Sequence, residues 1–167
     1  MKRWLQRLAT AVALVLPALL VYAWQTRDLL PADERAPAPA LPTLQASGQG
    51  YDPAVLSGRP VVVYFFAPWC GVCSASAPQL RWFHAMAGDS PQLLLVALDY
   101  DSAAEAAAWA ADRGLDVPVL LGDGATAAAW RIRGYPTYYV LDREGRLAAR
   151  DFGVSILPGL WWRTWRL

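Results

Sequence analysis

Blocks of hydrophobic and polar residues along the chain predict an N-terminal helix followed by an α/β domain. An uncharged run, residues 8–24, comes directly after a short basic segment. Farther on, apolar runs rich in β-branched and aromatic residues have the length of buried strands. Stretches with helical spacing separate them, which predicts a mixed sheet flanked by helices. The expected strands are 61–66, 92–98, 117–121, 137–141 and 146–152, and the expected helices are 71–87, 102–113, 123–130 and 157–165.

The N-terminus has the features of a membrane anchor. Residues 1–7 are basic, and residues 8–24 are long enough as a helix to be near the short limit for crossing a bilayer. The basic side should stay in the cytoplasm, so the domain should be exported as a single-pass protein of the inner membrane, facing the periplasm. The alternative is a signal peptide that is cleaved after Ala23.

The remaining chain divides into a linker and one domain. Residues 25–40 are rich in proline and alanine, which predicts an extended tether. Residues 41–167 have the length of one domain. From residue 28 onward acidic residues outnumber basic ones by three, so a basic face for nucleic acid is not expected.

The two cysteines of the chain, Cys70 and Cys73, follow the first buried strand at Cys-x-x-Cys spacing. If Gly71 opens a helix, Cys70 lies at its N-terminus, where free N–H groups and the helix dipole favour a thiolate and lower the pKa of the thiol. Cys73 lies about one turn deeper and can resolve a mixed disulfide formed by Cys70. This arrangement is typical of a redox site.

Two structural roles for the cysteines are weaker alternatives. A disulfide across two residues closes a very small loop and constrains the unfolded chain little. A zinc site needs about four nitrogen or sulfur ligands, and beyond Cys70 and Cys73 the chain offers only His84. We interpret His84 as a packing or surface residue of the helix, since it lies more than two turns beyond Cys73.

Two separated motifs resemble the thioredoxin superfamily: residues 65–73, Phe-Phe-Ala-Pro-Trp-Cys-Gly-Val-Cys, and residues 134–137, Gly-Tyr-Pro-Thr. The resemblance covers about residues 40–167 and implies a thioredoxin-like fold. The anchored layout with an extra helix at 102–113 is similar to the TlpA/ResA-like branch. Within that branch, residues 73–78 and the Trp/Arg-rich C-terminus look most like ScsD-like protein disulfide oxidoreductases, named for suppression of copper sensitivity.

The resemblance also implies roles for residues around the cysteines. Pro136 should follow a cis peptide bond and lie beside the cysteine pair, where it also helps to exclude metal. Tyr135 and Thr137 should then shape a groove in which the backbone pairs with an extended substrate. Trp69 should form an apolar rim beside Cys70, unless it is a core aromatic. Gly71 and Val72 border the thiolate and should tune its reactivity.

One position departs from the resemblance. ResA-like and cytochrome c maturation proteins typically carry a glutamate three residues after the second cysteine, and this chain has Ser76 there. A buried carboxylate would disfavour the thiolates and assist proton transfer. Its absence weakens a dedicated role in cytochrome c maturation.

The sequence therefore predicts a membrane-anchored periplasmic thiol–disulfide oxidoreductase that needs no prosthetic group. Its expected partners are cysteine-containing exported proteins, a membrane thiol-transfer protein that resets the pair, and the inner membrane through residues 8–24. Two alternatives stay open: a reductase for cytochrome c maturation, and a copper-binding or metal-delivery module that uses both thiols.

Overall fold

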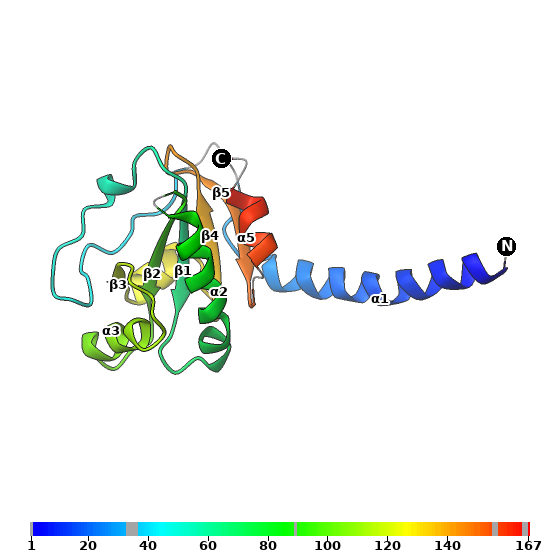
Figure 1. Ribbon diagram of the computed structural model, residues 1–167, viewed down its shortest axis with the longest axis horizontal. Coiled ribbons are helices and arrows are strands. Elements are labelled where there is room, and N and C mark those ends of the chain that lie inside the picture. The colour runs from blue at the N-terminus through cyan, green and yellow to red at the C-terminus, as the bar shows by residue number, and fades with distance from the viewer. Residues whose placement is uncertain (1, 33–36, 89, 155–156, 165–166) are drawn as a thin grey trace.

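The computed structural model describes residues 2–32, 37–88, 90–154, 157–164 and 167, and shows a long helix attached to an α/β domain (Figure 1). Helix α1 (Lys2–Thr26) extends away from the domain. Within the described residues, no helix meets the combined length and apolarity needed to cross a membrane.

A five-stranded sheet forms the centre of the domain. Its strands are β1 (Val61–Phe66), β2 (Gln92–Ala97), β3 (Val119–Leu121), β4 (Thr137–Leu141) and β5 (Leu147–Phe152). They lie in the order β3-β2-β1-β4-β5. β1 pairs parallel with β2 and antiparallel with β4, so the predicted mixed sheet is confirmed. All six residues of β1 are buried, as expected for an uninterrupted apolar strand at the centre of a sheet.

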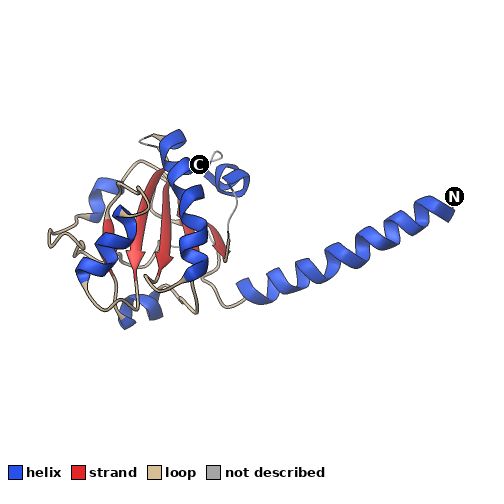
Figure 2. Ribbon diagram, turned by 60° about the horizontal axis from the view of Figure 1, so that its bottom comes forward, coloured by secondary structure: helices blue, strands red, loops and turns tan. Residues whose placement is uncertain are grey.

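Alternate residues of β1 point into two separate hydrophobic cores. Val62, Tyr64 and Phe66 face the core covered by α2 (Gly71–Ala87), α3 (Ala103–Ala111) and α5 (Leu157–Thr164). The opposite face packs under η1 (Pro53–Leu56) and the segment that follows α4 (Gly124–Ala129). Helices accordingly lie on both sides of the sheet (Figure 2).

Described residues of the expected linker pack on this second face. Leu29 is only 3% exposed and belongs to its core. One guanidinium nitrogen of Arg150 donates to the carbonyl oxygens of Leu29 and Leu30, at 2.8 and 2.7 Å. Farther along, the indole of Trp130 donates to the carbonyl of Ala40 at 3.0 Å. The start of this segment is therefore held by the domain, which its proline-rich composition did not indicate.

Candidate active site

The two cysteines lie where β1 leads into α2. Cys70 is the N-cap of α2, and its Sγ accepts the backbone N–H of Cys73 at 3.1 Å. A disulfide joins the pair, with Cα atoms 5.2 Å apart. Cys70 is 6% exposed whereas Cys73 is fully buried. An incoming thiol or disulfide therefore reaches Cys70 first, and the N–H donor at its sulfur stabilises negative charge there.

The loop before β4 lies beside the cysteines. The Tyr135–Pro136 peptide bond is cis, which confirms what the resemblance implied. Pro136 and Thr137 are buried. The Thr137 hydroxyl donates to the Gly134 carbonyl at 2.8 Å, and the Pro136 carbonyl accepts the N–H of Gly153 at 2.9 Å. These bonds fix the loop. Thr137 is the first residue of β4, and neither it nor Pro136 is among the residues that line the cavity described next.

A cavity of about 360 Å³ opens next to Cys70. Trp69 and Tyr135 form part of its wall, and their rings meet edge to face with centroids 5.9 Å apart. Trp69 is 68% exposed, so it lies at the rim of the cavity and not in the core. The described residues that line it are Trp69, Cys70, Asp99, Ala127, Ile132, Arg133, Gly134 and Tyr135.

Asp99 connects the two predicted motifs, and the sequence analysis missed it. Its carbonyl accepts the Trp69 indole N–H and its carboxylate accepts the Tyr135 hydroxyl, both at 2.9 Å. Burial first, and then the Asp99 carboxylate, raise the pKa of Tyr135 above its ordinary value, so the phenol stays a donor. The available signal was topological: Asp99 follows β2, whose carboxyl end lies beside that of the parallel strand β1.

Beneath the pair, two hydroxyl groups occupy the protein interior. The Tyr64 hydroxyl donates to the Cys73 carbonyl at 3.3 Å, and burial raises the pKa of this phenol above its ordinary value. Ser76 is fully buried, and its hydroxyl donates to the Val72 carbonyl at 2.9 Å. At the position where the resemblance expects a glutamate, the structure thus has a neutral group satisfied by the helix backbone.

Gly71 and Val72, between the cysteines, lie on the surface. Val72 is 48% exposed, and a Cβ added at Gly71 would meet no atom within 4 Å. Their tuning role stays a prediction. Among the described residues, no group of three histidine, cysteine, aspartate or glutamate side chains gathers to hold a metal.

The fold and the site together define a thiol–disulfide oxidoreductase with a redox cysteine pair. The chain belongs to the Redoxin family, whose model matches residues 31–159.

Curated relatives agree with this assignment. The thioredoxin-like protein YneN of Bacillus subtilis is 24% identical over 149 residues, covering 87% of this chain and 86% of that protein. The soluble secreted antigen MPT53 of Mycobacterium tuberculosis is 43% identical over 72 residues, or 43% of this chain and 38% of the antigen. The thiol:disulfide interchange protein DsbE of Yersinia pestis is 29% identical, covering 70% of this chain and 62% of DsbE. The last two matches span less than two thirds of those relatives.

Solved structures show the same fold. A DsbF homologue from Corynebacterium diphtheriae superposes with a TM-score of 0.73 at 23% identity, covering 83% of this chain and 91% of that one. A secreted disulfide oxidoreductase of Mycobacterium tuberculosis, described as homologous to Escherichia coli DsbE, gives 0.67 at 22% identity and covers 76% and 96%. The predicted thioredoxin-like fold is therefore confirmed.

Proposed function

We propose that the chain exchanges disulfides with cysteines of exported proteins, from a domain held at the outer face of the cytoplasmic membrane. The observation that carries the proposal is the geometry of Cys70: its sulfur caps a helix N-terminus and borders a cavity walled by Trp69 and Tyr135. That cavity offers an apolar surface for the residues flanking a substrate cysteine. The relative MPT53 is a secreted antigen, which supports export of the domain.

The exchange proceeds in two balanced steps. The Cys70 thiolate attacks one sulfur of a substrate disulfide, so a Cys70–substrate disulfide forms and the other substrate sulfur leaves as a thiolate. Cys73, losing its proton to that leaving thiolate or to water, then attacks Cys70. The Cys70–Cys73 bond forms, the second substrate sulfur leaves, and two electrons have passed from the protein to the substrate. The reverse sequence oxidises a substrate dithiol.

Two variants test the roles of the cysteines. In the full chain, Cys70→Ser should abolish both insulin reduction and oxidation of reduced ribonuclease. Cys73→Ser keeps the nucleophile but cannot resolve it, so it should accumulate a mixed disulfide that reducing agent releases. Unchanged turnover in Cys70→Ser, or mixed disulfides formed only through Cys73, would overturn the assignment.

The direction of electron flow follows from the reduction potential of the pair. A value near about −270 mV would make it a reductant, and a value near about −120 mV would make it an oxidant of exported proteins. A reductant needs a membrane thiol-transfer partner to reset it. A reductant potential would also favour a role in cytochrome c maturation. Ser76 disfavours that role, because it leaves no carboxylate at this position.

The membrane anchor is the second part of the proposal. Residues 8–24 carry no charge, and α1 presents apolar side chains that no other element covers, such as Leu14 and Leu20 at 71% and 62% exposure. Apolar surface of this extent favours a lipid environment. Because the described part of α1 does not meet the requirements for a span, the anchor needs a direct test.

Substituting Leu14 and Leu20 by aspartate supplies this test. Each aspartate near the middle of an inserted helix costs about 2.5–3.5 kcal/mol, so the double variant should leave the membrane fraction. The same leucine-to-aspartate change at Leu44, which is exposed on the domain, should not alter fractionation. Release of the wild-type chain by alkaline carbonate would contradict the anchor, and a shortened mature chain would indicate cleavage instead.

A further inference from the structure

A single guanidinium is fixed beside the first turn of α2. Arg113, just beyond the end of α3, donates through one terminal nitrogen to the Ser74 hydroxyl at 2.8 Å. The other terminal nitrogen donates to the Trp109 carbonyl at 2.9 Å. These two bonds tie the C-terminal end of α3 to the residue that follows Cys73.

The ring of Trp109 supports this cation from below. The Arg113 guanidinium lies 4.6 Å from the centroid of the Trp109 ring, and the same indole stacks on Phe66 of β1 at 4.1 Å. Arg113 is half-buried and both of its hydrogen bonds are partly buried, so part of the guanidinium is removed from water. Among the described residues, no carboxylate lies within ion-pair distance of Arg113. A fixed, partly desolvated and unneutralised charge acts strongly on its surroundings.

The charge is connected to the active cysteine through Ser74. The Ser74 hydroxyl, which accepts from Arg113, donates in turn to the carbonyl of Cys70 at 3.3 Å. Hydrogen bonds that are linked in this way polarise one another. The field of Arg113 also reaches Tyr64 beneath the pair: burial raises the pKa of that phenol, and Arg113 partly opposes the shift.

Other charged and titratable groups lie on the elements around the site. The side chain of Arg81 on α2 passes close to Gly114, the residue after Arg113. On β4, Tyr138 acts on the Tyr64 phenol. Asp99 and Arg133 line the cavity on the far side of Cys70 and have opposite charges. The carboxylate of Glu105, in the first turn of α3, accepts the N–H of Asp101. The charged and titratable groups on these elements are Tyr64 on β1, Arg81 on α2, Asp99 and Asp101 after β2, Glu105, Asp112 and Arg113 on or beside α3, Arg133 and Tyr135 before β4, and Tyr138 on β4.

We propose that Arg113 is a positioning residue that, acting through Ser74, stabilises the Cys70 thiolate and so favours the dithiol over the disulfide. The inference rests on the proposed function, because it concerns the same cysteine. When two glutathione molecules reduce the pair, their sulfurs join as oxidised glutathione and two electrons enter the protein. One of the two glutathione protons goes to Cys73 and the other to water, which leaves Cys70 as a thiolate and Cys73 as a thiol. Only the thiolate is stabilised by a nearby cation.

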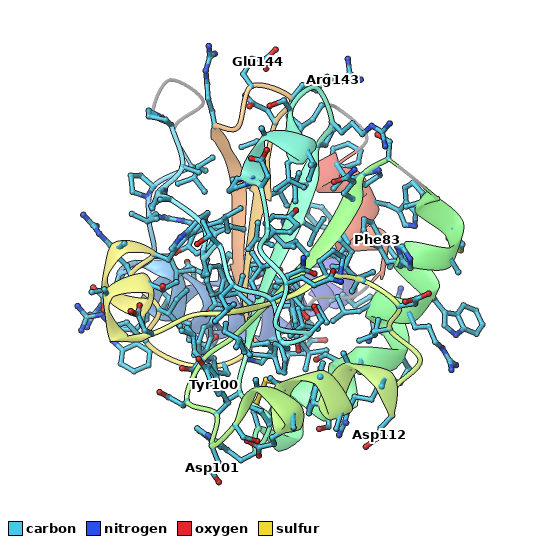
Figure 3. The ribbon with its side chains drawn as sticks, turned by 90° about the vertical axis from the view of Figure 1, so that its left-hand side faces the viewer. Phe83, Tyr100, Asp101, Asp112, Arg143 and Glu144 are labelled. Carbon is cyan, nitrogen blue, oxygen red and sulfur yellow. A yellow bond between two sulfur atoms is a disulfide. The ribbon has the colours of Figure 1, made fainter. Side chains whose placement is uncertain are left out.

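The test uses the full chain in detergent and four variants. Arg113→Gln removes the charge, Arg113→Lys keeps it, and Ser74→Ala removes the connecting hydroxyl. The matched control is Arg143→Gln, an identical change at an exposed arginine. Arg143 lies at the end of the domain opposite to Asp112, the neighbour of Arg113 (Figure 3). Two quantities are measured: the pH profile of Cys70 alkylation by iodoacetamide, and the equilibrium with glutathione at pH 7.

We expect Arg113→Gln to slow alkylation below the profile midpoint by about threefold to fivefold, as loss of a nearby opposite charge predicts. The glutathione equilibrium should shift toward the disulfide by about the same factor, equivalent to about 14–21 mV for this two-electron couple. Ser74→Ala should shift both quantities in the same direction. Arg113→Lys should lie nearer to wild type than Arg113→Gln does, and Arg143→Gln should match wild type.

The outcomes separate this inference from the proposed function. If Arg113→Gln and Arg143→Gln give the same profile and the same equilibrium, the inference is wrong while the cysteine chemistry stands. If Arg113→Lys behaves like Arg113→Gln, packing on Trp109 and not charge is the cause, which also overturns it. If the wild-type pair fails to exchange with glutathione at all, the proposed function itself fails.

Discussion

The packing of Leu29 gives a prediction about the start of the domain. This leucine follows α1 by only a few residues, yet its side chain is 3% exposed and packs into the core beneath the second face of the sheet. Leu29→Ala removes three buried carbons and leaves a cavity. Such substitutions cost about 2–5 kcal/mol. Because Leu29 lies at the boundary of the core, where the chain can relax, we expect the low end, about 2 kcal/mol.

A loss of about 2 kcal/mol corresponds to roughly a thirtyfold change in the unfolding equilibrium constant. It should lower the midpoint of urea unfolding with little change in slope, measured by tryptophan fluorescence of the full chain in detergent. The matched control is Leu44→Ala, since Leu44 is 50% exposed and should cost less than about 0.5 kcal/mol.

Arg150 supplies an independent check on the same segment, since its guanidinium holds the carbonyl oxygens of Leu29 and Leu30. If the segment is docked, Arg150→Gln and Leu29→Ala should be coupled and their costs should not add. Equal midpoints for Leu29→Ala and wild type would show that the segment does not pack on the domain in solution.

Three further changes probe the cavity and the core. Trp69→Ala should cost less than about 1 kcal/mol of stability, because the ring is 68% exposed. It should nevertheless lower kcat/KM for a protein substrate several-fold. A loss of about 3–5 kcal/mol in the free energy of unfolding would instead indicate that Trp69 is a core residue. Tyr135→Phe removes the bond to Asp99 and should raise KM about fivefold with kcat nearly unchanged, as loss of about 1 kcal/mol predicts. An unchanged KM would show that the bond between Tyr135 and Asp99 does not support substrate binding. Gly122→Ala places a Cβ 2.7 Å from Leu98 and should cost about 1–3 kcal/mol in thermal unfolding, whereas Gly124→Ala meets nothing within 4 Å and should be tolerated.

The sheet and the cysteine site could be predicted from the sequence because their signals are local. Sequence patterns placed three features to within a few residues: the all-apolar strand at Val61–Phe66, the Cys-x-x-Cys pair after it, and the last two strands, β4 and β5. The cis bond before Pro136 was a different kind of prediction, since only the family resemblance implied it.

Contacts between segments far apart in the chain could not be predicted in the same way. Asp99 bonds to Trp69 and Tyr135, which are 30 and 36 residues away, and Arg113 bonds to Ser74 across 39 residues. No periodicity encodes these pairs, because they depend on how β2 and α3 lie beside the start of α2. The docking of Leu29 was missed for the same reason: a proline-rich composition indicates an extended chain but not the surface on which it rests.

Two features of the site act in one direction on the reduction potential, and together they give the last prediction. A carboxylate near the cysteines would destabilise thiolates, and this chain has the neutral, backbone-bonded Ser76 where the resemblance expects one. A cation stabilises thiolates, and Arg113 is fixed within two hydrogen bonds of Cys70.

Since only the reduced form carries a thiolate, both features favour the dithiol and make the pair more oxidising. We therefore expect a potential above the value of about −270 mV that is typical of thioredoxin, measured by equilibration of the full chain with glutathione. Introducing Ser76→Glu should lower the potential, because a buried negative charge beside the pair penalises the thiolate. A wild-type value at or below about −270 mV would show that other interactions outweigh the Arg113 charge and the neutral Ser76, and would favour a reductant.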